Sequence, residues 1–262
     1  MPLIHPTAIV DPLAELDSTV TVGPYTVIGP HVRIGANTRI DGHCVIEGHT
    51  TIGRDNHIFP FCSIGAISQD KKYRGEPTRL EIGNGNTIRE FCTMHLGTVQ
   101  DEGVTRVGDN NWIMTYVHIA HDCRVGSNTV LSSSAQLAGH VHVGDWAVLG
   151  GFTGVHQFVK IGAHAMTGAQ ALLLQDVPPF VTAAGSPARP AGINAEGLKR
   201  RGFSPEVILS VRRAFKTLYR SGLTLAEARQ AITAQREAEP HAAEALQLML
   251  SFLDSASRGI IR

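Results

Sequence analysis

An aliphatic residue recurs at every sixth position between residues 107 and 161 without a slip. These positions are Val107, Ile113, Ile119, Val125, Leu131, Leu137, Val143, Leu149, Val155 and Ile161. A helix turns by about 100° per residue, so it would carry these side chains to three different faces. Six is a multiple of the two-residue strand period, so extended segments joined by bends can keep them on one buried face. The pattern predicts a parallel β-helix of hexapeptide repeats.

The predicted coils place several histidines along one edge. If three hexads make one triangular coil, residues eighteen apart stack on neighbouring coils about 4.8 Å apart. Ile119, Leu137 and Val155 have this spacing. The polar side chains that follow them by one to three positions are His121, His140, His156 and Gln157. A row of imidazoles along one corner is a candidate site.

The same six-residue repeat starts near the N-terminus. Its aliphatic positions are Ile4, Val10, Leu16, Val22, Ile28, Ile34, Ile40, Ile46, Ile52, Ile58 and Ile64. Glycine often follows them, which favours a tight corner. The histidines of this half fall at scattered repeat positions. We interpret this half as scaffold and its histidines as solvated or structurally satisfied.

Two polar segments interrupt the repeat. The first covers residues 66–79, and because Ile82 follows Ile64 by eighteen residues, we expect a loop that replaces one whole coil. Long loops on a rigid scaffold often carry function. This loop holds a mixed set of charges suited to a polar ligand, although a solvated excursion is an equal alternative: Gln69, Asp70, Lys71 and Lys72. The second covers residues 97–106, and Val107 follows Met94 by thirteen residues, so this loop is not an integral coil.

Beyond Ile161 the regular pattern fades into a proline-rich segment that we interpret as a linker. The residues after this segment show the pattern of helices. We therefore expect a β-helical domain over residues 1–190 and a helical domain over residues 191–262. Asn194 can cap a short helix, and Ser204 with Pro205 starts one that runs to about Arg220. Thr224 with Glu227 forms a capping box. Pro240 opens a last helix whose apolar face holds Ala245, Leu246, Met249 and Leu253.

Composition narrows the class of protein. The chain has 262 residues, 43% of them hydrophobic, and a formal net charge of +0, which does not suggest a general nucleic-acid binder. No N-terminal signal pattern and no run of 18 apolar residues is present, so we expect a soluble cytoplasmic protein without a membrane span. Four cysteines occupy the inward slot four residues after a repeat aliphatic and are expected to be free core thiols: Cys44, Cys62, Cys92 and Cys123.

Positive charge gathers between residues 199 and 220, where seven basic residues face one acid, Glu206. Arg212, Lys216 and Arg220 are four residues apart and would form a stripe along a helix, with Arg213 beside it. The stripe is either a solvated face or a docking surface for an acidic protein or a phosphate group.

Five segments carry a family resemblance: HIAHDC at 118–123, LAGHVHVGD at 137–145, GVHQF at 154–158, QDKKYRGEPTR at 69–79 and NAEGLKRRGF at 194–203. Together they resemble the UDP-N-acetylglucosamine 3-O-acyltransferases of lipid A synthesis, from about Ile4 to Arg262. The resemblance implies a left-handed parallel β-helix, a homotrimer, and a reaction that needs neither cofactor nor metal.

The family reaction moves an (R)-3-hydroxyacyl group from acyl carrier protein to the 3-hydroxyl of UDP-N-acetylglucosamine. By resemblance His121 is the general base, Asp122 orients it, and the Gly139 N–H holds the oxyanion. The resemblance further implies that Gln69, Asp70 and Lys72 act across a subunit boundary, and that Asn194, Glu196 and Arg200 contact the uridine and phosphates. The remaining substrate-binding residues that it implies are His95, His118, His140, His156, Gln157, Met166 and Ala169.

Three alternatives remain open at this point. A sibling N-acyltransferase shares the β-helix, a γ-carbonic-anhydrase-like protein would hold zinc with three histidines, and a binding or scaffold protein would turn over no thioester. Two positions depart from the family pattern. Ala169 stands where glycine accompanies longer acyl chains and methionine shorter ones, and Pro187 replaces a histidine found in some members.

Overall fold

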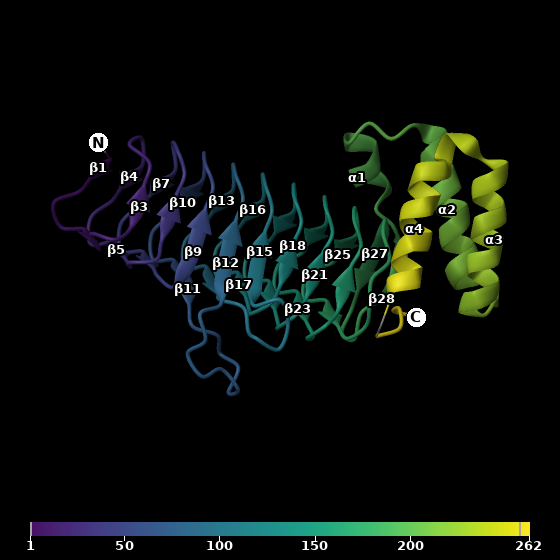
Figure 1. The fold of residues 1–262 in the computed structure, drawn as a ribbon. Helices are drawn as coiled ribbons and strands as arrows, with labels where there is room; N and C mark the ends of the chain where they lie inside the picture. The colour runs from purple at the N-terminus through teal and green to yellow at the C-terminus, as the bar shows by residue number, and fades with distance from the viewer. Residues whose placement is uncertain (1, 257) are drawn as a thin grey trace.

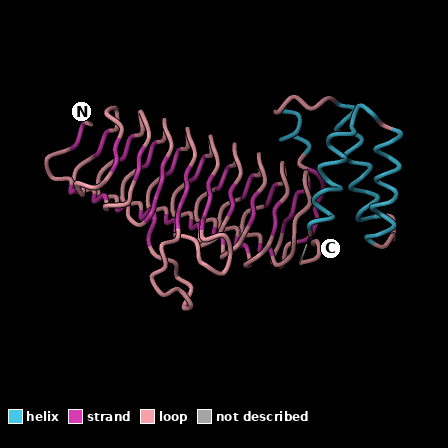
Figure 2. The backbone as a smooth tube through the Cα atoms, viewed as in Figure 1, coloured by secondary structure: helices cyan, strands magenta, loops and turns pink. Residues whose placement is uncertain are grey.

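The computed structural model describes residues 2–256 and 258–262. Figure 1 shows a long prism of stacked coils with a group of helices at its C-terminal end. Most strands are only two residues long, because each hexad places one aliphatic side chain inward and then bends. Figure 2 shows strands and turns alternating along the whole prism.

Three sheets form the faces of the prism. The first has eleven strands: β1 (Leu3–Ile4), β4 (Thr21–Val22), β7 (Arg39–Ile40), β10 (His57–Ile58), β13 (Thr87–Ile88), β16 (Trp112–Ile113), β19 (Val130–Leu131), β22 (Val148–Leu149), β25 (Met166–Thr167), β27 (Val181–Ala184) and β28 (Arg189–Ile193). The second has nine: β2 (Ile9–Val10), β5 (Val27–Ile28), β8 (Val45–Ile46), β11 (Ser63–Ala66), β14 (Thr93–His95), β17 (His118–Ile119), β20 (Gln136–Leu137), β23 (Gly154–Val155) and β26 (Leu172–Leu173). The third has eight: β3 (Glu15–Leu16), β6 (Arg33–Ile34), β9 (His49–Ile52), β12 (Arg79–Ile82), β15 (Val104–Val107), β18 (Arg124–Val125), β21 (His142–Val143) and β24 (Lys160–Ile161).

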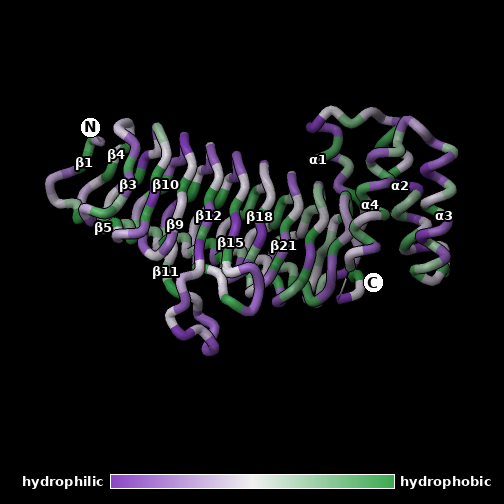
Figure 3. Tube along the Cα trace, in the orientation of Figure 1, coloured by the Kyte–Doolittle hydropathy of each residue, from purple (hydrophilic) through white to green (hydrophobic). Residues whose placement is uncertain are grey.

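The predicted stacking is confirmed. Ile119 pairs with Leu137, and Leu137 pairs with Val155, in parallel register on the second sheet. Their side chains are at most 4% exposed, and burying each such side chain is worth about 1.5–3 kcal/mol. The hydrophobic positions recur from coil to coil in Figure 3.

The first loop does not replace a whole coil, so that prediction is wrong. Ile64 pairs with Met94 in the second sheet, whereas Ile82 pairs with Ile52 and Val107 in the third. The segment between β11 and β12 is therefore extra chain inserted at one corner. The second loop, between β14 and β15, leaves from the same corner, and its non-integral length is confirmed.

Regular strands continue past Ile161, so the predicted fading into a linker is also wrong. β25 pairs with β22, β26 with β23, and β27 with β25. β27 then turns back to pair antiparallel with β28, which is the last strand of its sheet. Pro190 is tolerated there because an edge strand does not need every N–H.

The helical part follows β28 directly. It consists of α1 (Ala195–Arg200), α2 (Pro205–Arg220), α3 (Leu225–Ala238), the short 3₁₀ helix η1 (Pro240–Ala242) and α4 (Ala243–Ser255). The predicted N-caps at Asn194 and Ser204 and the Thr224–Glu227 capping box are confirmed. The helices enclose a core of their own, in which the predicted apolar face of α4 is buried. Among the described residues, no helix has both the length and the apolar character needed to cross a membrane.

The four cysteines are free and buried, as predicted. Each thiol contacts a backbone carbonyl oxygen of a neighbouring coil at 3.1–3.2 Å. Burial raises the pKa of the Cys123 thiol to about 12, so this side chain stays protonated. These thiols are core filler.

Candidate active site

The corner between the second and third sheets carries the site. Asp122, His140 and Phe158 occupy the same position on three successive coils, with backbone φ of 60°, 62° and 66°. This left-handed conformation is more accessible to Asp and His than to most residues. It turns the chain from β17 into β18 and from β20 into β21, and Gly139 lies under His121 in the next coil.

His121 and Asp122 form a hydrogen-bonded pair. The His121 Nδ1 lies 2.9 Å from Asp122 Oδ2, and because a carboxylate only accepts, Nδ1 carries the proton. Asp122 is 1% exposed, and the Thr98 N–H and hydroxyl also donate to it at 2.8 and 2.6 Å. The arrangement leaves His121 Nε2 available as a base.

Gly139 has no side chain because the imidazole of His121 occupies that space. A Cβ on Gly139 would lie 2.5 Å from His121 Cε1 and 2.6 Å from Nε2. The Gly139 carbonyl accepts from the Phe158 N–H. Its own N–H has no acceptor among the described residues, so this donor is free for a ligand.

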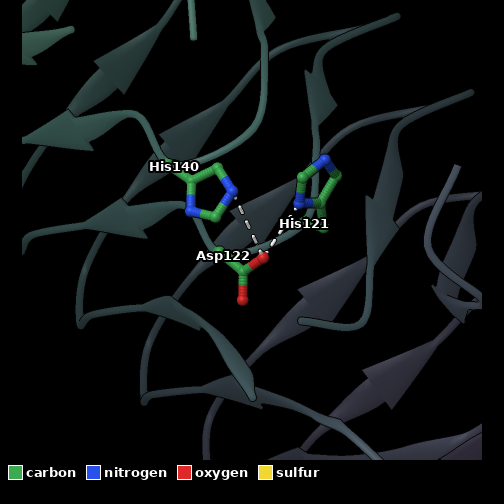
Figure 4. Close-up of side chains that lie close together, drawn as sticks. All are labelled: His121, Asp122 and His140. Carbon is green, nitrogen blue, oxygen red and sulfur yellow. Dashed lines mark hydrogen bonds and ion pairs between the residues drawn. The ribbon is translucent and has the colours of Figure 1, made fainter. Parts of the chain in front are cut away.

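His140 faces the same carboxylate from the next coil (Figure 4). Its Nε2 lies 3.8 Å from Asp122 Oδ2, and its Nδ1 lies 2.9 Å from Asp101 Oδ2. The ring stacks on Phe158 with centroids 4.3 Å apart and meets the His121 ring edge-on at 5.1 Å. These contacts hold both imidazoles in fixed orientations.

Two further predicted histidines support the site from the second sheet. The Thr93 hydroxyl lies 2.7 Å from His118 Nδ1. Burial, with smaller effects from His95 and His121, lowers the pKa of His118 to about 4, so it is neutral near pH 7. His95 is 7% exposed, and its Nδ1 donates to the Ile67 carbonyl at 2.8 Å.

These residues open into a groove of about 460 Å³ along the second sheet. Its lining is polar around His121 and apolar toward β26, and consists of Gln69, Asp70, His118, Ala120, His121, Gln136, Leu137, Ala138, Gly139, Gly154, Val155, His156, Leu172 and Leu174. The Lys72 N–H donates to Asp70, and this bond is the main reason that the pKa of Asp70 is lowered. Gln69 and Asp70 thus reach the groove of their own chain.

Other predicted site residues lie outside this groove within one chain. Lys72 and Gln157 are exposed, Met166 lies on β25 of the first sheet, and Ala169 lies at the next corner along the chain. The remaining three are at the start of the helical part: Asn194 caps α1, and Arg200 pairs with Glu196 at 3.4 Å on its surface.

A second cavity of about 390 Å³ lies near these helical residues, between the last coils and the helices. Its lining includes His164 and Arg201, neither of which was predicted to be a site residue. The Arg201 guanidinium lies over the Trp146 ring, 5.3 Å from its centroid. Burial, followed by the charge of Arg201, lowers the pKa of His164 to about 4. The signal for Arg201 was its place inside the NAEGLKRRGF segment.

A larger hollow, about 970 Å³, lies elsewhere, on the outer face of the third sheet against α4. Charged side chains line it, including Arg106, Arg124 and Lys160. The His121–Asp122 pair is not part of its lining, so the corner is the better candidate for the site.

The corner cluster also has the composition of a metal site. Ligand atoms of His121, Asp122 and His140 lie within 4.8 Å of one another. Asp122 Oδ2 already accepts from His121 and Thr98. Two imidazoles converge here among the residues that the structure describes, whereas the zinc alternative needs three. The hydrogen bonds fit proton transfer better than metal binding.

The basic stripe lies on the exposed side of α2. Arg212, Lys216 and Arg220 are exposed, and none has an acidic partner among the described residues. Arg213 differs, because it pairs with Glu239 at 2.7 Å and lowers the pKa of that carboxyl to about 2. Three of the four cations are therefore available to a partner.

Known proteins match the chain over its whole length. A family model described as Udp N-acetylglucosamine O-acyltransferase, domain 2, matches residues 176–261, and one described as bacterial transferase hexapeptide (six repeats) matches residues 105–139. The acyl-[acyl-carrier-protein]–UDP-N-acetylglucosamine O-acyltransferase of Janthinobacterium sp. strain Marseille is 64% identical, with 100% of both chains covered. The chain belongs to this O-acyltransferase family. The equally named protein of Herminiimonas arsenicoxydans is 61% identical over the same span.

Solved structures of the O-acyltransferase family agree. UDP-N-acetylglucosamine acyltransferase of Francisella novicida superposes with a TM-score of 0.95 at 41% identity, covering 99% of this chain and 94% of that one. The Moraxella catarrhalis O-acyltransferase gives 0.95 at 44% identity, with 99% of both chains covered. The predicted fold, a left-handed parallel β-helix followed by a small helical part, is confirmed. Family membership decides against the N-acyltransferase, carbonic-anhydrase-like and scaffold alternatives.

Proposed function

We propose that the chain transfers an (R)-3-hydroxyacyl group from acyl carrier protein to the 3-hydroxyl of UDP-N-acetylglucosamine, the first step of lipid A synthesis. The observation that carries this proposal is the His121–Asp122 pair lying over the free Gly139 N–H, in a groove with an apolar end. A sugar hydroxyl is a poor nucleophile and needs a base, and neutral imidazole serves near neutral pH.

In the proposed reaction, His121 Nε2 takes the proton of the 3-hydroxyl while its oxygen attacks the thioester carbon. Asp122 stabilises the imidazolium through Nδ1, and the Gly139 N–H binds the oxyanion. The carbon–sulfur bond then breaks, and the imidazolium returns the proton to the pantetheine thiolate. The products are the acylated nucleotide sugar and the free carrier thiol.

Direct attack, without an acyl-enzyme, is supported by the lining of the groove. The described lining residues include no serine, threonine, cysteine or lysine. An acyl-enzyme formed on a hydroxyl, a thiol or a lysine amine would need one of these residues. The four cysteines are buried in the core instead.

The lining of the groove suggests where each part of the substrates would bind. Leu172, Leu174 and Val155 offer apolar cover for the acyl chain, with Met166 and Ala169 proposed to act at its far end. Polar groups near the corner, including His118, His140, His156 and Gln157, would hold the sugar and the pantetheine. Asn194, Glu196 and Arg200 would contact the uridine and phosphates, and the stripe on α2 would receive the acidic carrier protein.

We further propose a cytoplasmic homotrimer in which Gln69, Asp70 and Lys72 also reach a neighbouring subunit. An exposed column of stacked rings supports an assembly. Five rings stack along the corner between the first and second sheets, with neighbouring centroids 4.8–5.1 Å apart: Tyr25, His43, Phe61, Phe91 and Tyr116. The tyrosine and phenylalanine residues of this column are 41–60% exposed. Exposed apolar surface of this extent is typical of an interface.

The test is acyl transfer by the purified full chain. Incubation with UDP-N-acetylglucosamine and a panel of 3-hydroxyacyl carrier proteins should yield the O-acylated nucleotide sugar, identified by mass spectrometry. His121→Ala should lower the rate by at least about 10²-fold with an unchanged melting temperature. If the wild type transfers an acyl group from none of the donors, the proposed activity is refuted. Near-normal turnover by the variant would remove His121 from the mechanism.

A further inference from the structure

The second inserted loop delivers a carboxylate to the outer side of His140. Asp101 lies between β14 and β15 and is held by its own loop. The Glu102 N–H donates to Asp101 Oδ1 at 2.9 Å, and Arg124 lies 3.4 Å from the same oxygen. Only Oδ2 faces His140, with its Nδ1 at 2.9 Å.

Asp101 acts as an acceptor in this contact. Burial raises the pKa of Asp101, but the hydrogen bond from His140, the Glu102 N–H and the charge of Arg124 together hold it below the usual range. A carboxylate has no proton to give, so His140 must donate from Nδ1. In a neutral imidazole, Nε2 is then an acceptor.

With the proton on Nδ1, the unprotonated Nε2 of His140 points toward Asp122. It lies 3.8 Å from Asp122 Oδ2, too far for a hydrogen bond. Two acceptors face one another across this gap, and Asp122 Oδ2 is already bound by His121 and Thr98. If Nε2 carried the proton instead, His140 would compete with His121 for Asp122. Among the described residues, Nε2 has no hydrogen-bond donor of its own.

The geometry points to Asp101 as a positioning residue that fixes His140 with its proton on Nδ1, so that Nε2 accepts a hydrogen bond from a hydroxyl or amide N–H of the sugar acceptor. This inference rests on the proposed function for the identity of the acceptor. Because Asp101 accepts the Nδ1 proton of His140, His140 does not donate to Asp122, and Asp122 remains the acceptor for His121. Stacking on Phe158 prevents the ring from turning away.

The test is Asp101→Asn in the full-length protein. Imidazole nitrogen NMR spectra of histidine-labelled protein without substrate should show His140 protonated at Nδ1 in the wild type. The amide of the variant can donate to Nδ1, so the proton should move to Nε2. The value of kcat/KM for UDP-N-acetylglucosamine should fall by up to about tenfold, as for loss of a hydrogen bond between neutral groups, while KM for the carrier protein stays unchanged.

Glu102→Gln is the matched control. Glu102 belongs to the same loop and pairs with Arg124 and Arg106, not with a histidine. This variant should keep the wild-type tautomer and turnover. If Asp101→Asn melts early, Asp101→Ala repeats the test without the competing amide, and should lose the Nδ1 preference and the same turnover.

Each outcome decides a separate point. Wild-type His140 protonated at Nε2, or an Asp101 variant that is folded and has wild-type kcat/KM for the sugar, overturns the inference. An equal loss in Glu102→Gln overturns it too, because the loop as a whole would then be responsible. A wild type that transfers no acyl group refutes the proposed function instead, and the tautomer of His140 still reports on Asp101.

Discussion

The sharpest prediction concerns one methyl group at Gly139. The backbone φ of Gly139 is not positive, so alanine there adds no strain of its own. Its Cβ, however, would lie 2.5 Å from His121 Cε1. Carbon atoms pack at about 3.5–4.0 Å, so the imidazole must move by about 1 Å.

The movement breaks the alignment that the reaction needs. His121 is tied to Asp122 by a single 2.9 Å hydrogen bond, and displacement lengthens this bond or turns Nε2 away from the acceptor. A misplacement of about 1 Å can cost about 10²-fold in rate. Gly139→Ala should therefore lower kcat about 10²-fold while KM for both substrates changes little.

Steady-state acyl transfer with a melting curve for each protein checks this prediction. Gly151→Ala is the control, because its Cβ would meet only the Ser133 carbonyl oxygen, at 3.4 Å. The control should retain wild-type turnover. A folded Gly139→Ala protein with wild-type kcat would mean that the contact between Gly139 and His121 does not set the catalytic geometry.

Three other predictions test the parts around this corner. Arg212→Glu with Lys216→Glu should raise KM for acyl carrier protein and weaken its salt dependence, leaving KM for the nucleotide sugar unchanged; Arg213→Gln should mainly lower the melting temperature, because it removes an ion pair, and equal effects on both substrates would contradict the docking assignment. Ala169→Met should shift the preferred donor to a shorter acyl chain, since each uncovered methylene costs roughly 0.8 kcal/mol. An unchanged ranking across the donor panel would show that Ala169 does not set the acyl-chain length. Because burial holds the pKa of His164 near 4, below the usual 6.5 of an unfolded chain, unfolding free energy should fall as pH drops from 6.5 to 4; His164→Asn should flatten this slope in denaturant titrations, and an unchanged slope would show that His164 does not contribute.

The hexad repeat predicted the coils because its period is strict. Ile119, Leu137 and Val155 stack as their spacing requires. The same logic failed between Ile64 and Ile82, because all three faces carry the same aliphatic pattern and an inserted loop has no period. Spacing alone could not tell a full coil from extra chain at a corner. The N-cap residues predicted the starts of the helices correctly, because a cap depends only on residues within one turn of the helix.

The histidines of the site were predictable because they belong to the repeat. His121 and His140 follow from positions within the hexads, Asp122 was implied by the family resemblance, and the convergence of these three side chains is visible in Figure 4. Gln69 and Asp70 stood out only because a polar loop interrupts the repeat. Thr98 and Asp101 were missed because they belong to a loop without register. Their contacts with Asp122 and His140 depend on how that loop folds back on the prism.

The two inserted loops give a reason for the proposed chemistry to lie at this corner and not at another with the same geometry. Successive coils have equivalent bends, and left-handed residues recur at many of them. A loop can leave the prism only at a bend, where it breaks no strand pairing, and both loops leave between the second and third sheets. They bring Asp70 to the groove, Thr98 to Asp122 and Asp101 to His140. The rigid column therefore fixes the spacing of His121 and Gly139, the proposed base and oxyanion donor, while the loops add the side chains that orient the histidines.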